Sequence, residues 1–193
     1  MNLFHRIRTK VFMQLFWLLR RSKFRFLSRS AVFVGPHRVD GSEGISIGDR
    51  SFFQRGVWLY CCGNNSLKAN LTVGKNCVFG YNNHITCVRD VVIGDYVLTA
   101  NNVYISDNLH GYEDIDLPIM MQPVLYKNSV EIGSGAWIGE NVCIIGASVG
   151  KNSVIGANSV VTKNIPDFCV AVGAPAAVIR RFDVQLRKWV DVK

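Results

Sequence analysis

The sequence predicts an all-β solenoid, a parallel β-helix of about five to six coils, on three observations. Mostly aliphatic residues recur at six-residue spacing, small or β-branched residues follow most of them by four positions, and glycine often follows them directly. Six-residue periodicity is typical of a parallel β-helix, in which three short strands build one coil of about eighteen residues. The repeated residues form five triplets: Ile47, Phe53, Leu59; Val73, Phe79, Ile85; Ile93, Thr99, Ile105; Ile132, Ile138, Ile144; and Val149, Ile155, Val161.

The repeated residues are expected to fill the core of a triangular prism. The glycines after them are expected to adopt backbone conformations that only glycine reaches cheaply, because the chain turns sharply there. These glycines are Gly48, Gly74, Gly94, Gly133, Gly139, Gly150 and Gly156. A β-sandwich would instead show period-two alternation and turn signals every 8–12 residues or so. Neither pattern is present.

The chain divides into an N-terminal arm (1–39), a repeat domain (40–182) and a C-terminal tail (183–193). The net charge of +8 arises in the arm, which holds nine Lys or Arg and no acid, whereas the rest has thirteen basic and fourteen acidic residues. Apolar residues in the arm approximate helical spacing. Two interpretations remain open: a basic amphipathic helix on an anionic membrane surface, or a cap on the open end of the solenoid.

Other roles for the arm are less well supported. Its uncharged run 11–19 is too short to span a bilayer. Basic residues follow this run directly, and the small residues that form the cleavage site of a signal peptide are missing there. No nucleic-acid motif accompanies the basic residues, so nucleic-acid binding is not expected. Six cysteines without a CxxC pair predict free thiols and a cytoplasmic protein, peripheral on the inner face of the membrane if the arm binds lipid.

Interruptions of the repeat all fall after the third hexapeptide of a triplet, at one edge of the prism. The largest interruption is a polar loop at 106–131. Insertions in repeat proteins tend to gather on the binding face. We therefore expect functional residues in or beside this loop.

The segment Val130–Arg181, VEIGSGAWIGENVCIIGASVGKNSVIGANSVVTKNIPDFCVAVGAPAAVIRR, resembles the hexapeptide-repeat acetyltransferases. It is most similar to their sugar and polysaccharide O-acetyltransferase branch, which includes maltose, galactoside, lipopolysaccharide and capsule O-acetyltransferases. The resemblance covers about 45–182 and is most specific at 137–139, at 160–166 and in the loop sequence SDNLHGYEDIDLPI at 106–119. It implies a left-handed β-helix, a homotrimer, acetyl-CoA as cosubstrate and no metal.

The resemblance places the catalytic base at His110, at the start of the long loop. A sugar hydroxyl is a poor nucleophile until a base takes its proton, and imidazole has a suitable pKa near neutrality. His84 is the rival candidate, but its repeat position predicts a structural or acceptor-contacting role. Relatives often carry a second histidine where this chain has Asn108.

By the same resemblance, the acceptor sugar is expected to contact Asn82 or Asn83 and Asp90. The residues expected to bind coenzyme A are Glu140, Ala157, Thr162, Lys163, Arg180 and Arg181. Arginine near the phosphates is chemically sensible because its guanidinium offers paired donors to phosphate oxygens. Glu140 stands where relatives have serine, and Glu113 or Asp114 in the loop is a candidate for orienting His110.

The expected activity is acetyl-CoA-dependent O-acetylation of a sugar hydroxyl in a bacterial surface polysaccharide or its precursor. A small soluble acceptor, such as a free sugar, a nucleotide sugar or serine, is the alternative. A zinc enzyme on the same scaffold would need three converging histidines, and the repeat domain has only His84 and His110. A purely structural β-helix would have no use for the histidine loop.

Overall fold

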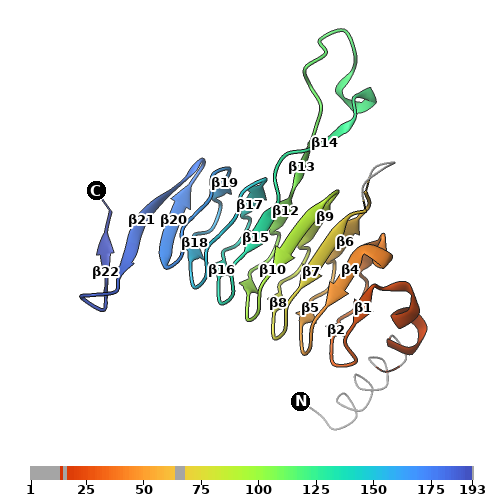
Figure 1. Ribbon diagram of the computed structural model, residues 1–193, viewed down its shortest axis with the longest axis horizontal. Helices are drawn as coiled ribbons and strands as arrows, with labels where there is room; N and C mark the ends of the chain where they lie inside the picture. The colour runs from red at the N-terminus through yellow and green to blue at the C-terminus, as the bar shows by residue number, and fades with distance from the viewer. Residues whose placement is uncertain (1–13, 15–16, 64–67, 193) are drawn as a thin grey trace.

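A computed structural model describes residues 14, 17–63 and 68–192, which form a left-handed parallel β-helix (Figure 1). Three parallel sheets make the faces of a triangular prism, so the predicted fold class is confirmed. Face A contains β1 (Phe26–Leu27), β4 (Ile45–Ile47), β7 (Asn70–Val73), β10 (Asp90–Ile93) and β15 (Val130–Ile132). Face C contains β3 (Arg38–Asp40), β6 (Trp58–Cys61), β9 (His84–Cys87), β12 (Tyr104–Ser106), β17 (Cys143–Ile145) and β19 (Val160–Val161).

Face B is the longest sheet and extends past the prism. Its parallel part contains β2 (Val32–Phe33), β5 (Phe52–Phe53), β8 (Val78–Phe79), β11 (Leu98–Thr99), β16 (Trp137–Ile138), β18 (Val154–Ile155) and β20 (Cys169–Gly173). Two antiparallel strands, β21 (Ala176–Asp183) and β22 (Lys188–Asp191), continue it. The expected C-terminal tail is therefore part of a sheet, and the rings of Phe182 and Trp189 meet edge to face at 5.6 Å. Short 3₁₀ turns are η1 (Arg21–Lys23), η2 (Ser42–Gly44) and η3 (Ile119–Met121).

The core lies inside the prism, where equivalent residues of successive coils stack in register. All fifteen residues of the five predicted triplets are at most 2% exposed, which confirms their predicted inward orientation. The rings of Phe33, Phe53 and Phe79 stack at centroid distances of 4.4 and 4.6 Å. Because each inward side chain contacts its equivalent one coil away, the core is continuous along the axis.

The predicted boundary between arm and repeat domain at residue 40 was wrong. Strands β1, β2 and β3 pair with β4, β5 and β6, so a first coil begins at β1. The reason is that Leu27, Phe33 and Val39 continue the six-residue spacing and extend the core. Trp17 and Phe24 pack against this coil, as the capping interpretation expects. The rest of the expected helical arm, 1–13 and 15–16, lies outside the described residues.

The repeated glycines do not adopt the left-handed backbone conformation, contrary to the expectation from sequence. Left-handed φ angles occur two residues after these glycines, as at Asn76, Asn141, Asn152 and Asn158, and at the equivalent corner residues Asn82 and Asn102. The repeated glycines are needed because adjacent coils approach closely. A Cβ on Gly74 would lie 2.7 Å from the backbone of Gly94, nearer than real atoms pack.

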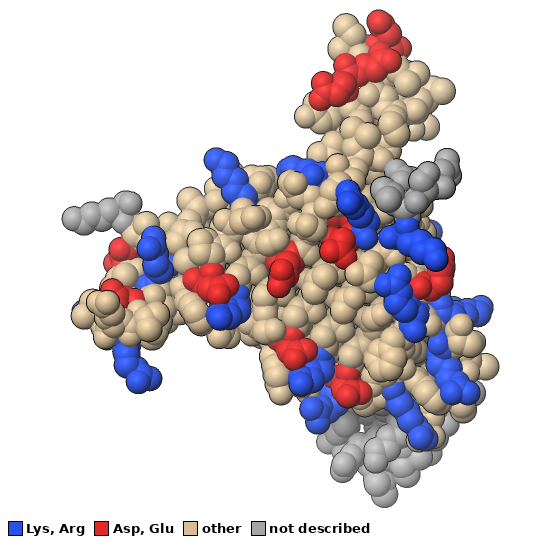
Figure 2. All heavy atoms as spheres, in the orientation of Figure 1, with Lys and Arg blue, Asp and Glu red and all other residues tan. Residues whose placement is uncertain are grey.

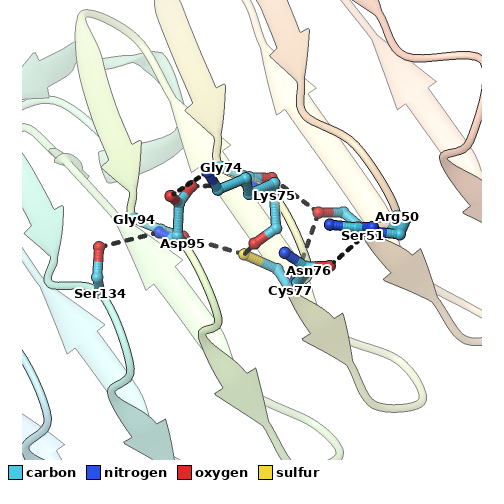
Figure 3. A network of polar contacts seen from close by, with 9 residues as sticks. All are labelled: Arg50, Ser51, Gly74, Lys75, Asn76, Cys77, Gly94, Asp95 and Ser134. Atoms are coloured by element: carbon cyan, nitrogen blue, oxygen red, sulfur yellow. Dashed lines mark hydrogen bonds and ion pairs between the residues drawn. The ribbon is translucent and has the colours of Figure 1, made fainter.

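Polar residues at the corners tie successive coils together (Figure 3). The Ser51 hydroxyl donates to the Gly74 carbonyl at 2.7 Å, and the Cys77 thiol donates to the Gly94 carbonyl at 3.0 Å. Asp95 accepts a hydrogen bond from the Lys75 amide at 2.9 Å. Where the small residue four positions after a core residue is serine or cysteine, as at Ser51 and Cys77, it therefore binds a corner carbonyl as well as filling space.

Candidate active site

A β-hairpin leaves the prism after the fourth coil and projects outward (Figure 1). It contains β13 (Asn108–His110), η3 and β14 (Val124–Tyr126), with His110 paired to Val124. We call residues 107–127 the hairpin. It occupies the polar insertion at 106–131 and carries the expected catalytic histidine.

Asp107 anchors the base of the hairpin. Its carboxylate is fully buried and accepts hydrogen bonds from the backbone amides of Val88, Arg89 and Asp90 at 2.9, 2.8 and 2.9 Å. The Asn108 side-chain amide donates to it at 2.8 Å. Three consecutive amides compensate a buried carboxylate well. Sequence reasoning missed Asp107; its position directly after an inward-facing strand was the available signal.

Gln122 holds the outer part of the hairpin together. This buried side chain donates to the carbonyls of Asp114 and Leu117 at 2.8 and 2.9 Å, and its oxygen accepts from the Asp114 amide at 3.3 Å. The exposed tip contains Glu113, which lies away from the Asp107 anchor. The structure thus gives the backbone of Asp114 a role in shaping the hairpin.

A cavity of about 550 Å³ lies between the hairpin and face C. His110 lines it from the hairpin with Asn108, Leu109 and Val124, and its side chain is exposed. Face C contributes Trp58, Tyr60, His84, Thr86 and Tyr104. The structure therefore brings together the two repeat-domain histidines, which the sequence separates by 25 residues. Hydroxyl, amide and imidazole groups next to aromatic rings make the cavity suited to a polar organic ligand.

His84 lies between two aromatic side chains on neighbouring strands of face C. Its ring stacks on Trp58 at 4.1 Å and lies 5.3 Å from Tyr104, while Arg38 covers the far face of Trp58 at 4.4 Å. The Nε2 atom is buried and has no hydrogen-bond partner among the described residues. Burial, together with the nearby Arg38 charge, lowers the pKa of His84. The stacked His84 ring lines the cavity on the side of face C.

The residues expected to contact the acceptor lie elsewhere. Asn83 is 1% exposed, and its side-chain amide donates to the Gly80 carbonyl, the Ala100 carbonyl and the Thr99 hydroxyl, so this side chain is taken up by contacts within its own corner. Asn82 occupies a left-handed corner and donates to Asn102. Asp90 lies on face A, where it accepts from Asn70 at 2.8 Å. The side chains that line the cavity beside His110 are different ones.

The six residues expected to bind coenzyme A are spread over the C-terminal coils. Glu140 and Ala157 lie at the corner between faces B and C, and Thr162 and Lys163 follow β19 at the corner between faces C and A. Arg180 and Arg181 lie on β21. Glu140 accepts a hydrogen bond from the Asn101 amide at 3.1 Å, and Arg180 pairs with Asp191 at 3.1 Å. A groove of about 470 Å³ is lined by residues that include Gly133, Gly150 and Asn164, and none of the six expected residues is among those that line it.

Within the described part of the chain, no cluster of three or more His, Cys, Asp or Glu side chains is arranged to hold a metal ion. All six cysteines are free thiols there. No described helix is both long enough and apolar enough to cross a membrane.

Comparison with known proteins identifies the family. Residues 70–107 and 129–163 match the model described as the hexapeptide repeat of succinyl-transferase. A probable acetyltransferase of Mycobacterium tuberculosis is 36% identical over 172 residues, covering 86% of this chain and 56% of the relative. The galactoside O-acetyltransferase of Escherichia coli is 39% identical over 157 residues, covering 77% of this chain and 72% of the relative.

A solved structure shows the same fold. A hexapeptide-repeat acetyltransferase of Vibrio cholerae, determined with acetyl-coenzyme A, is 22% identical, has a TM-score of 0.59 and covers 91% of this chain and 84% of its own. This chain spans little more than half the length of the mycobacterial relative. With the repeat, the fold and the close match to the galactoside enzyme together, the chain belongs to the hexapeptide-repeat acetyltransferase family.

Proposed function

We propose that the protein is an acetyl-CoA-dependent O-acetyltransferase for a sugar hydroxyl of a surface polysaccharide or its precursor, with His110 as general base. The observation that carries this proposal is the exposed His110 side chain at the edge of a polar cavity, on a hairpin anchored by Asp107. A base must reach its substrate. An exposed imidazole three residues after the Asp107 anchor meets that need.

In the proposed reaction, His110 takes the proton of the sugar hydroxyl while its oxygen attacks the thioester carbonyl of acetyl-CoA. The tetrahedral intermediate then breaks the carbon–sulfur bond. The protonated imidazole returns the proton to the leaving thiolate, so the products are the acetylated sugar and free coenzyme A. The Vibrio neighbour solved with acetyl-coenzyme A supports the choice of donor.

The chemistry of the cavity supports a sugar acceptor. The hydroxyls of Tyr60, Thr86 and Tyr104 and the amide of Asn108 are groups that donate and accept hydrogen bonds, as sugar hydroxyls require. Aromatic rings supply apolar surface for the C–H faces of a sugar. The similarity to a galactoside O-acetyltransferase supports the same acceptor class.

We also propose that the active form is a homotrimer. Outward side chains of face B form a continuous apolar row from the first coil to the last: Val32, Phe52, Val78, Leu98, Trp137, Val154 and Val170. Val78, Leu98 and Trp137 are 40, 45 and 51% exposed. A long exposed apolar row favours burial against a neighbour. The residues expected to bind the donor lie on separate corners, which also favours a site completed by a second copy.

The direct test is His110→Ala, with Tyr112→Ala in the same hairpin as the control. General-base loss is expected to lower acetyl transfer by about 10²–10⁴-fold, while Tyr112→Ala retains it. Acetyl-CoA should raise the melting temperature of both variants, because a ligand that binds only the folded state stabilises it. Transfer is measured against a panel of glycans, free sugars, nucleotide sugars and serine. A His110→Ala variant that keeps more than about a tenth of the activity would assign the base elsewhere.

A further inference from the structure

Charge is strongly uneven along the prism axis. Residues 17–55, which build the N-terminal end, contain eight basic and three acidic residues, and all eight basic side chains are exposed. Residues 90–148, which include the hairpin, contain one basic and eight acidic residues. In Figure 2 basic side chains gather over the N-terminal coils, and acidic ones mark the hairpin tip.

The basic residues surround the N-terminal end and do not follow one face. Arg21 and Lys23 lie in η1, Arg29 lies at the corner between β1 and β2, and Arg38 lies on β3. A single basic face would favour contact along the side of the prism. A ring of basic residues favours contact through the end.

Exposed apolar side chains belong to the same N-terminal segment as several of these basic residues. Leu18 and Leu19 are 58 and 64% exposed, and Phe26 is 57% exposed. The neighbouring Trp17 is fixed to the first coil, because its Nε1 donates to the Leu27 carbonyl at 2.9 Å, and its ring lies 4.7 Å from the Arg21 guanidinium. Apolar side chains flanked by exposed arginine and lysine are typical of segments that lie at a lipid–water interface.

We infer that the N-terminal end, residues 17–29, is a docking surface for an anionic membrane and that the prism stands end-on upon it. Anionic lipid attracts the exposed basic side chains and admits Leu18 and Leu19 into its interfacial region. The acidic hairpin is repelled from the same surface. A nucleic acid fits this surface less well, because only Phe26 of the three exposed apolar side chains offers a ring on which a base can stack.

The orientation has a consequence for the acceptor, which rests on the proposed function. Adjacent parallel strands lie about 4.8 Å apart, and the hairpin leaves the fourth coil, three spacings above the first. His110 is then held about 14 Å above the docked coil. A sugar joined directly to the lipid headgroup lies below this level. The acceptor we infer is an outer sugar of a lipid-linked glycan.

The surface is tested by co-sedimentation with vesicles of phosphatidylglycerol and phosphatidylcholine, and with vesicles of phosphatidylcholine alone. We compare Arg21→Gln/Lys23→Gln with Arg187→Gln/Lys188→Gln, which removes two exposed charges at the opposite end. The first pair is expected to weaken binding to the anionic vesicles roughly 10- to 30-fold. The second pair should bind like the unmodified protein. Circular dichroism confirms that both variants are folded.

Orientation is measured with brominated lipids, which quench nearby tryptophan fluorescence. Variants that keep only Trp17 or only Trp189, the other tryptophans being replaced by Phe, report on the two ends of the prism. Quenching of Trp17 without quenching of Trp189 is expected. Quenching of both would show a side-on orientation and overturn the inferred height of His110.

Other outcomes overturn the docking surface itself. These are equal weakening by both charge pairs, equal binding to vesicles without phosphatidylglycerol, and binding of RNA but not of vesicles. None of these readouts requires transfer activity. A failure of acetyl-CoA stabilisation would therefore count against the proposed function and leave the membrane result separate.

Discussion

The coils and the hairpin differ in how their contacts are distributed. In the coils, an inward residue such as Ile138 contacts its equivalents in the neighbouring coils, and the same contact recurs along the axis. In the hairpin, the contacts of Asp107 and Gln122 occur once. The repeating part thus supplies most of the burial, and the part that carries His110 depends on a few single residues. Such a division places the proposed chemistry where sequence change disturbs the fold least.

The largest difference is expected between two isoleucines. Ile138 is fully buried on β16, whereas Ile115 at the hairpin tip is 94% exposed. Ile138→Ala should lower the free energy of unfolding by about 2–5 kcal/mol, because it removes core contacts and leaves a cavity. Ile115→Ala should change it by no more than about 0.5 kcal/mol. Urea unfolding at one protein concentration measures both; similar losses would contradict the contrast.

Asp107 tests how the hairpin joins the coils. Asp107→Asn should lower the free energy of unfolding by about 1–3 kcal/mol, because an amide nitrogen then faces backbone donors. Asp116→Asn, an exposed change in the same hairpin, is the control. We also expect transfer to fall in the Asp107 variant more than acetyl-CoA binding does, since the anchor positions His110. Comparison of kcat with the acetyl-CoA-induced melting shift separates the two effects.

Glycine substitutions compare the tightness of packing in the two regions. A Cβ at Gly74 would lie 2.7 Å from the Gly94 backbone, whereas at Gly111 the nearest atom is the Pro123 oxygen at 3.1 Å. Gly74→Ala is expected to cost about 1–3 kcal/mol through overpacking. Gly111→Ala should cost less. Thermal unfolding followed by circular dichroism shows which variant loses more stability. A greater loss in Gly111→Ala would be evidence that the hairpin is packed more tightly than the coils.

The smallest effect concerns pH. Burial and the Arg38 charge lower the pKa of His84 in the folded protein, so the unfolded chain binds protons more readily. The stabilisation from neutral His84 is present above the unfolded pKa of about 6.5 and is lost as pH falls through the folded pKa. His84→Phe keeps a stacked ring and should flatten this decline in melting temperature between neutral and mildly acidic pH. Part of the decline should remain in this variant, because burial also lowers the pKa of His37.

Most of the fold follows from the sequence because a repeating solenoid uses the same local pattern in every coil. The six-residue spacing predicted the parallel strands and every inward residue of the five triplets. The first coil was missed although Leu27, Phe33 and Val39 keep the spacing, because the basic residues among them suggested a separate arm. The close approach of adjacent coils, which requires the repeated glycines, was also missed, because the distance between coils cannot be read from neighbouring residues in the sequence.

The candidate site also combines features set by neighbouring residues along the chain with contacts between coils. The sequence by itself determined that the chain is a β-helix with a histidine-bearing insertion, because spacing and residue type are properties of neighbours along the chain. Only the tertiary structure decided that Asp107 binds the amides of 88–90, that His84 lines the same cavity as His110, and that Asn83 is used by its own corner. These contacts join residues that are distant in the sequence, and the register between coils determines which residues meet.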